Sequence, residues 1–260
     1  MYHTTKNILS LALYAGEIML QNGAETYRVE DTIIRICQAY NISYVESFVI
    51  PTGIFVSVDQ GNADTKVVTF IKRIKTRTID LNKVSQINDF SRKVSVSNLS
   101  VEEGMEILKK IDTLSKYPKK IKLFCSGIAS ACFGLLLGAT YIDSLSSFII
   151  SILVYISVSF IEHLNSNLFI QNFIGGIIAA LLAILAVNIH LGINIDKIII
   201  SSIMILVPGV AITNAVRDSI SGELLSGVAR SAEAIIIAIS IAVGVGTVMN
   251  AWIYLRGGIS

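Results

Sequence analysis

A short polar segment between two apolar runs is the part of this 260-residue sequence best suited to chemistry. Arginine presents a planar fork of hydrogen-bond donors that suits a carboxylate, and carboxyl groups in a partly dry site can bind and release protons. The combination predicts a path for a carboxylate-bearing substrate that is exchanged with protons. The segment's charged and amide side chains are Asn214, Arg217, Asp218, Glu223, Arg230 and Glu233.

The same charges also have a structural interpretation, which stays open at this stage. Arg217 and Arg230 fit the excess of basic residues on the cytoplasmic side of membrane helices. Glu233 is placed three residues after Arg230, where helix neighbours can pair. Asp218 would neutralise the arginine beside it.

The pair Pro208-Gly209 precedes this segment inside an apolar run. Proline lacks the amide hydrogen that a helix needs, and glycine makes unwinding easy. The pair therefore predicts an interruption of a membrane helix. An interrupted helix can present its positive end to an anion in a wet cavity, and a proline kink can also serve packing alone.

A second group of charges opens a helix near the start of the chain and consists of Glu25, Arg28, Glu30 and Asp31. Such acids complement the helix dipole, or form a carboxylate-rich site near the predicted turn Pro51-Thr52-Gly53. His3 is the only histidine in the first 117 residues, and the three cysteines have no CxxC spacing. We therefore expect no metal, no other cofactor and no disulfide.

The composition is that of an integral membrane protein, because 53% of the residues are hydrophobic and only 15% are charged, against roughly 25% in soluble domains. The charges are concentrated in the first half: up to Lys122 there are 17 basic and 13 acidic residues, and after it 4 and 6. A net charge of +2 without a basic run among aromatics argues against nucleic acid as a partner.

Residues 1–117 are predicted to form a cytoplasmic α+β domain with the order ααβββαα. Helical spacing covers 5–21 and 24–40, and β-branched and aromatic residues then fill 43–50, 54–59 and 65–74. A turn at Gln60-Gly61-Asn62 completes a three-stranded antiparallel meander. Two further helices follow, the last starting with a capping-box pattern at Ser100.

Residues 118–260 are predicted to be a five-helix transmembrane domain, because a span needs about 20 apolar residues. Lysines before the first span place the N-terminus in the cytoplasm and, after five crossings of the plasma membrane, the C-terminus outside. Four small residues suit close helix packing in the bilayer, within the chain, against a partner or against another copy: Gly134, Gly138, Gly175 and Gly176. The five spans are 123–140, 142–161, 168–190, 198–216 and 232–255.

Three separated motifs carry a resemblance to a known family: "NGAETYRVEDTIIRI", "VIPTGIFVSV" and "LVPGVAITNAVRDSISGELLSGVARSAEA". Together they resemble the N-terminal module of the threonine/serine exporter family, over nearly the whole chain. The resemblance implies proton-driven export of threonine and serine or, in a branch split into two subunits, of a dicarboxylate such as succinate. With no second module after its five spans, the chain resembles the larger subunit of that branch, which implies a smaller multi-span partner subunit.

Two other function classes stay open beside the transporter. The family's cytosolic module has been likened to hydrolases, and the group around Glu25 would then be a catalytic site. The sequence shows no Ser/His/Asp set and no phosphate loop to support that. A membrane-tethered regulatory domain is the third class.

Overall fold

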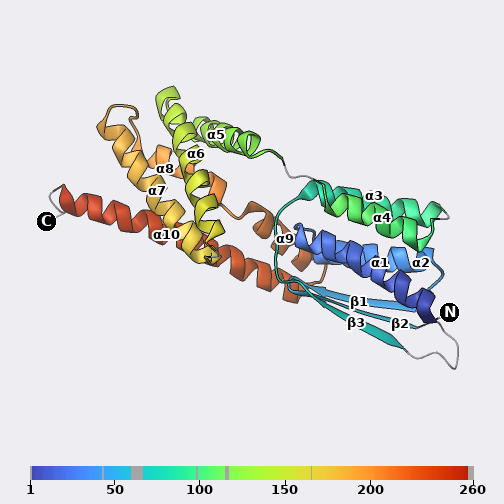
Figure 1. Ribbon diagram of the computed structural model, residues 1–260. Helices are drawn as coiled ribbons and strands as arrows, with labels where there is room; N and C mark the ends of the chain where they lie inside the picture. The colour runs from blue at the N-terminus through green and yellow to red at the C-terminus, as the bar shows by residue number, and fades with distance from the viewer. Residues whose placement is uncertain are drawn as a thin grey trace. The chain divides into compact units, whose positions relative to one another are not determined.

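The computed structural model describes residues 2–42, 44–59, 67–97, 99–114, 117–164 and 166–256 (Figure 1). The chain folds into two compact units. The first contains residues 1–115 and also 210–232, and the second contains 116–209 and 233–260. The sequence pattern predicted one membrane domain over 118–260, whereas the structure groups the segment 210–232 with the first unit.

Four helices make up most of the first unit, and local sequence signals set their ends. Gly23 has φ +92° and stops the first helix, and Asp80 accepts a hydrogen bond from the amide of Lys83 at the start of the third. The predicted capping box of Ser100 and Glu103 is present at the start of the fourth. These helices are α1 (Tyr2–Gln21), α2 (Thr26–Ala39), α3 (Leu81–Val96) and α4 (Val101–Asp112).

The predicted three-stranded antiparallel sheet is confirmed, with the strand order β1-β2-β3. Its strands are β1 (Tyr44–Ile50), β2 (Gly53–Asp59) and β3 (Val68–Arg73). The register places Val49 opposite Ile54. The turn expected at Gln60-Gly61-Asn62 lies outside the described residues.

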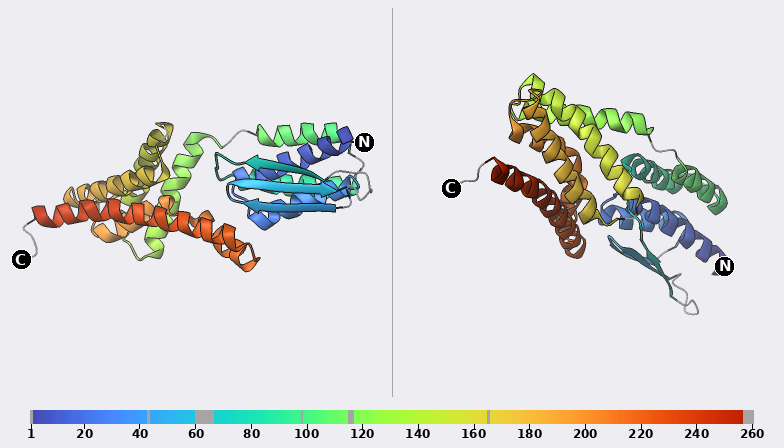
Figure 2. Two further views of the ribbon diagram at one scale, coloured as in Figure 1. Left: turned by 90° about the horizontal axis from the view of Figure 1, so that it is seen from below. Right: turned by 60° about the vertical axis from the view of Figure 1, so that its left-hand side comes forward.

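The core of the first unit lies around α1 and α2, which form a layer between the sheet and the pair α3 and α4 (Figure 1). Figure 2 shows the strands together on one side of α1 and α2. Burying each large aliphatic side chain contributes about 1.5–3 kcal/mol, so this layer is the main source of the unit's stability. The fully buried side chains of the unit's core include Leu9, Leu11, Ile18, Ile33, Ile36 and Ile54.

Residues 210–232 join this unit as a helical hairpin. Its first arm is α9 (Gly209–Ile220), and its second arm is the start of α10 (Leu224–Leu255). The two arms are joined by a short turn in which Gly222 has φ +92°, a conformation that glycine adopts without steric cost. We refer to residues 210–232 as the α9–α10 hairpin.

The second unit consists of the helices α5 to α8 and the rest of α10. In it α6 (Tyr141–His163) packs against α5 (Lys119–Leu136), α7 (Leu168–Asn188) and α8 (Ile195–Ile203). A single 3-10 turn, Met204–Leu206, follows α8.

Three helices of the described chain are long and apolar enough to cross a membrane: α6, α7 and α10. A fourth span exists if α8 and α9, a bent pair, count as one broken span. The expected first span differs, because α5 has three lysines in its first turn, which leaves only Leu123–Leu136 without charge, fewer than the roughly 20 residues a span needs. The five-span count therefore remains a proposal.

The four glycines expected at helix contacts have neighbours within the second unit. A Cβ at Gly134 would lie 3.1 Å from the Ser201 hydroxyl, and one at Gly176 would lie 2.7 Å from the carbonyl oxygen of Ile241 on α10. Gly175 faces Leu206 and Val158 in the same way. Gly138 has φ +74° just after α5, and its carbonyl accepts a hydrogen bond from Lys197. Gly134, Gly175 and Gly176 therefore lie at close contacts inside the second unit, and a packing role for them stays a prediction.

Candidate functional site

The predicted interruption at Pro208-Gly209 is confirmed. The 3-10 turn after α8 ends at Leu206, Val207 is extended with ψ 128°, and α9 begins at Gly209. Proline explains this geometry, because it lacks an amide hydrogen and disfavours the helical conformation of the residue before it. The interruption frees α9 to start in a new direction.

The α9–α10 hairpin packs onto the connection between α1 and α2, and thereby joins two motifs that the sequence separates. Asn214 on α9 donates from its side-chain amide to the carbonyl of Gly23 at 2.8 Å. Arg230 on α10 donates to the carbonyl of Ala24, also at 2.8 Å. Both carbonyls follow the end of α1, where backbone acceptors lack helical partners. The hairpin supplies those partners.

A fully buried carboxylate lies at the centre of this contact. Asp218 accepts a hydrogen bond from the amide of Thr26 at 3.1 Å, and its other oxygen lies 3.0 Å from Nε of Arg230. Helix α2 has no side-chain cap from its own N-cap residue, Glu25. Asp218 therefore caps α2 from another part of the chain, at the positive end of the helix dipole.

The second carboxylate of the site, Glu25, is buried and lies between two arginines. Arg217 contacts it at 2.5 Å and Arg28 at 3.1 Å. Burial would raise the pKa of Glu25, but hydrogen bonds from its own backbone, from Arg217 and from Arg28 outweigh it, so the pKa lies below its ordinary value. Glu25 therefore stays ionised at neutral pH.

A third carboxylate, Glu30, holds the free edge of the sheet one helical turn further along α2. It accepts a hydrogen bond from the amide of Val49 on β1 at 2.7 Å. The carbonyl of the same residue accepts one from the hydroxyl of Ser226 on α10 at 3.3 Å. Burial raises the pKa of Glu30 to about 7, against the Val49 hydrogen bond and with help from the charges of Glu223 and Asp218.

Most of the predicted charged and amide residues come together in one group, which we call the hairpin site. Its members are Glu25, Arg28, Glu30, Asn214, Arg217, Asp218, Glu223 and Arg230. The other predicted residues lie outside it. Asp31 forms an exposed pair with Arg35 at 2.8 Å. The turn Pro51-Thr52-Gly53 joins β1 and β2, and the carbonyl of Thr52 accepts a hydrogen bond from Ile74. Glu233 lies on α10 in the second unit.

Sequence reasoning missed Thr26, Val49 and Ser226, which complete the hairpin site through a helix amide, a strand peptide and a hydroxyl. Each one lies inside one of the three motifs that carried the family resemblance. That co-occurrence was the available signal, but no local pattern tells which motifs touch each other.

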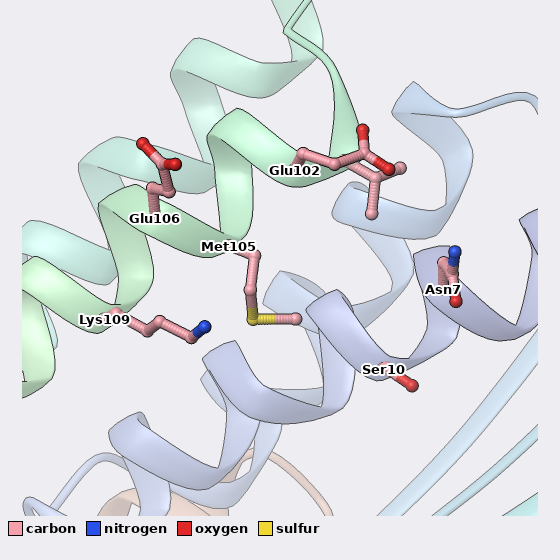
Figure 3. Close-up of a pocket in the computed structure, with 7 residues that line it drawn as sticks. Asn7, Ser10, Glu102, Met105, Glu106 and Lys109 are labelled. Carbon is pink, nitrogen blue, oxygen red and sulfur yellow. The ribbon is translucent and has the colours of Figure 1, made fainter.

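A surface cavity of about 340 Å³ lies elsewhere in the first unit, between α1 and α4 (Figure 3). Its lining includes Ser10, Met105 and Lys109, and none of the predicted site residues. Within the described part of the chain, no group of three or more His, Cys, Asp or Glu side chains is placed to hold a metal ion.

Comparison with known families agrees with the three motifs. The ThrE family model, described as "Putative threonine/serine exporter", matches residues 10–252. The chain belongs to the threonine/serine exporter family. The match includes every residue of the hairpin site. The resemblance inferred from the motifs is thereby confirmed.

Individual relatives in this family differ in length. The "Probable threonine/serine exporter" of Mycobacterium tuberculosis is 25% identical over 243 residues, which cover 93% of this chain and 45% of that protein. The "Threonine/serine exporter" of Corynebacterium glutamicum is 23% identical over 244 residues, covering 92% of this chain and 50% of that one. The chain thus spans about half the length of these two relatives.

A shorter relative is matched almost from end to end. The "Probable succinate transporter subunit YjjP" of Escherichia coli is 25% identical over 255 residues, covering 96% of each chain. No solved structure gives a significant match. The relatives are transporters by name, and the apolar helices α6, α7 and α10 are consistent with a membrane transporter.

Proposed function

We propose that this chain is a subunit of a proton-coupled secondary transporter in the cell membrane that exports small carboxylate-bearing metabolites. Threonine and serine, or a dicarboxylate such as succinate, are the substrate classes that the names of its relatives support. The word "subunit" in the name of the YjjP relative supports a partner, which we propose to be a smaller multi-span membrane protein.

The observation that carries this proposal is the buried pair of Asp218 and Arg230 at the start of α2. Arg230 and the amide of Thr26 hold a carboxylate here with little exposure to water. A substrate carboxylate has the same shape and charge as the Asp218 side chain, so the same donors suit it. The hairpin site is thus chemically matched to this class of substrate.

A link between proton binding and substrate binding is consistent with this arrangement. Protonation of Asp218 removes its charge and weakens its attraction to Arg230. The guanidinium and the amide of Thr26 are then available to the carboxylate of the substrate. Arg217, more than half exposed and paired with Glu25, is the first donor that an entering substrate meets. Binding of substrate and loss of the Asp218 charge are therefore coupled.

The membrane part of the proposal concerns the path and its direction. We propose five spans, with the N-terminus and the first unit in the cytoplasm and the C-terminus outside. The interruption at Pro208-Gly209 and the continuous helix α10, which carries Arg230 near its start, connect the hairpin site along the chain to the apolar helices. A helix broken within a span is typical of transporters.

Transport in proteoliposomes tests the proposal. The chain, with and without its partner subunit, is reconstituted and assayed with labelled threonine, serine and succinate at a series of pH gradients. We expect Arg217→Gln and Arg230→Gln to raise the KM, and Asp218→Asn to alter the pH dependence of transport. Arg35→Gln, which removes an exposed pair on the same helix as Glu25, is the matched control.

Two outcomes would contradict the proposal. Unaltered kinetics in all three site variants would mean that the hairpin site is not part of the transport path. Hydrolysis of small esters by the full chain, without transport of any tested carboxylate, would favour the hydrolase alternative.

A further inference from the structure

Side chains from two different helices form hydrogen bonds with the backbone of Val49 at the free edge of the sheet. Its amide donates to Glu30 on α2, and its carbonyl accepts from Ser226 on α10. Strand β1 is an edge strand, so these backbone groups have no neighbouring strand to pair with. The side chains of α2 and of the α9–α10 hairpin take that place, and Val49 thereby links the position of Glu30 to the hairpin.

The ionised groups that face Glu30 in this contact are acidic. Asp218 on α9 and Glu223 in the turn after it both lie close enough to act on Glu30 electrostatically. On α10, Arg230 pairs with Asp218, and on α2 itself Glu25 pairs with Arg28 and Arg217. Strand β1 contributes only the Val49 amide. Among the described residues, Glu30 has no ion-pair partner.

We propose that Glu30 is a proton-binding group that controls how firmly the α9–α10 hairpin is held on the rest of the first unit. Protonated Glu30 does not repel Asp218 and Glu223, and its carbonyl oxygen still accepts the Val49 hydrogen bond. Ionised Glu30 repels both carboxylates and drives the hairpin away from α2. Because the hairpin contains Asp218 and Arg230, the proton on Glu30 sets the fraction of molecules in which the hairpin site is assembled.

The direction of the pH effect follows from linkage. Burial, together with the charges of Glu223 and Asp218, raises the pKa of Glu30 to about 7 from an ordinary value of 4.5, and undocking of the hairpin would remove those two charges and lower the pKa again. The docked state therefore binds more protons between these pH values, and docking weakens as the pH rises through this window. The docking equilibrium constant changes by about tenfold for each unit by which docking shifts the pKa.

Hydrogen exchange of the full chain in lipid nanodiscs tests this inference. Protection of residues 210–232 is measured from pH 5.5 to pH 8.5 and corrected for the intrinsic pH dependence of amide exchange. We expect wild-type protection to fall as the pH rises, with a midpoint near neutrality. Glu30→Gln, a neutral side chain of the same shape, should keep the hairpin protected throughout. Glu106→Gln on the exposed face of α4 is the control and should follow the wild type.

A second variant keeps the inference testable if Glu30→Gln folds poorly. Glu223→Gln removes one of the charges that disfavour ionisation of Glu30, so the midpoint should move to lower pH. A pH-independent wild type, an unchanged pH step in Glu30→Gln, or an unmoved midpoint in Glu223→Gln would each overturn the inference.

The role of this group in export rests on the proposed function, but the exchange measurement does not. A chain that shows the pH step and transports no carboxylate would keep the proton-binding group and contradict the transporter. A chain that transports a carboxylate without the pH step would support the transporter and contradict the proton-binding role of Glu30.

Discussion

The amide of Thr26 donates a hydrogen bond to the carboxylate of Asp218, a residue 192 positions away in the chain, at 3.1 Å. The start of α2 is thus completed by α9, and the buried ion pair with Arg230 holds α9 to α10 at the same point. A helix end, a charge pair and the hairpin therefore form one structural element. Loss of any one of its parts should affect the other two.

We predict that Asp218→Ala destabilises the first unit by about 3–5 kcal/mol, because it leaves Arg230 buried without this partner and uncaps α2. Equilibrium unfolding in detergent measures the change. Asp31→Ala is the matched control, since its pair with Arg35 is exposed and contributes about 0–1 kcal/mol. Similar losses of stability in the two variants would show that the buried pair contributes no more to stability than the exposed pair.

The buried pair should also show coupling. Asp218→Ala combined with Arg230→Met should destabilise the protein by less than the sum of the two single changes, because the double variant leaves no buried charge unpaired. A double-mutant cycle on the same unfolding measurement gives this coupling energy. Strict additivity would mean that the two side chains act independently.

The stability of the first unit at acid pH should depend on Glu25. Its pKa is lowered in the folded state, so its contribution is fully present above its ordinary pKa of 4.5 and is lost as the pH falls through the lower folded value. We expect the thermal unfolding midpoint of the wild type to fall as the pH is lowered below 4.5. Glu25→Gln should be less stable at neutral pH and should show a smaller drop. Parallel pH profiles for the two proteins would contradict this.

Much of the local structure was predictable because local chemistry determines it. Ser100 and Glu103 satisfy each other at a helix start, and Pro208 cannot take part in a regular helix. The three strands follow from β-branched and aromatic runs separated by turn residues. Each of these signals lies within a few residues of the structure it predicts.

The hairpin site was predictable only in its parts. The acids of α2 and the charges of α9 were recognised separately, and each had a sufficient local explanation in the helix dipole or in membrane flanks. Their contact depends on packing between segments nearly 200 residues apart, which no periodicity reports. The first span was predicted from apolar content alone, and its helix α5 begins earlier, at Lys119, so that three lysines lie in its first turn.

The side of the membrane on which the chain ends should separate two topologies. Five spans place residues after Arg256 on the side opposite to the N-terminus. If α5 crosses together with α6, α7 and α10 while α8 and α9 form a re-entrant loop, four crossings remain and both ends share one side. A reporter that is active only outside the cytoplasm, fused after Arg256, should be active under the five-span proposal. Activity of a cytoplasm-specific reporter at that position would contradict it.

A close contact between α7 and α10 in the second unit gives a further prediction. A methyl group at Gly176 on α7 would lie 2.7 Å from the carbonyl oxygen of Ile241 and 3.3 Å from the amide nitrogen of Val245, both on the α10 backbone. Backbone atoms cannot rotate away as a side chain can, so Gly176→Ala must push the two helices apart. We expect a loss of about 1–3 kcal/mol, the range for an overpacked contact.

Gly246 provides the matched control for this contact, because it lies on α10 and a methyl group there meets no atom within 4 Å. Alanine is a better helix former than glycine, so Gly246→Ala should be neutral or stabilising by up to about 1 kcal/mol. Thermal unfolding in detergent compares the two variants. Equal midpoints would show that α7 and α10 can move apart without loss of stability. The absence of a side chain at Gly176 would then not be needed for their contact.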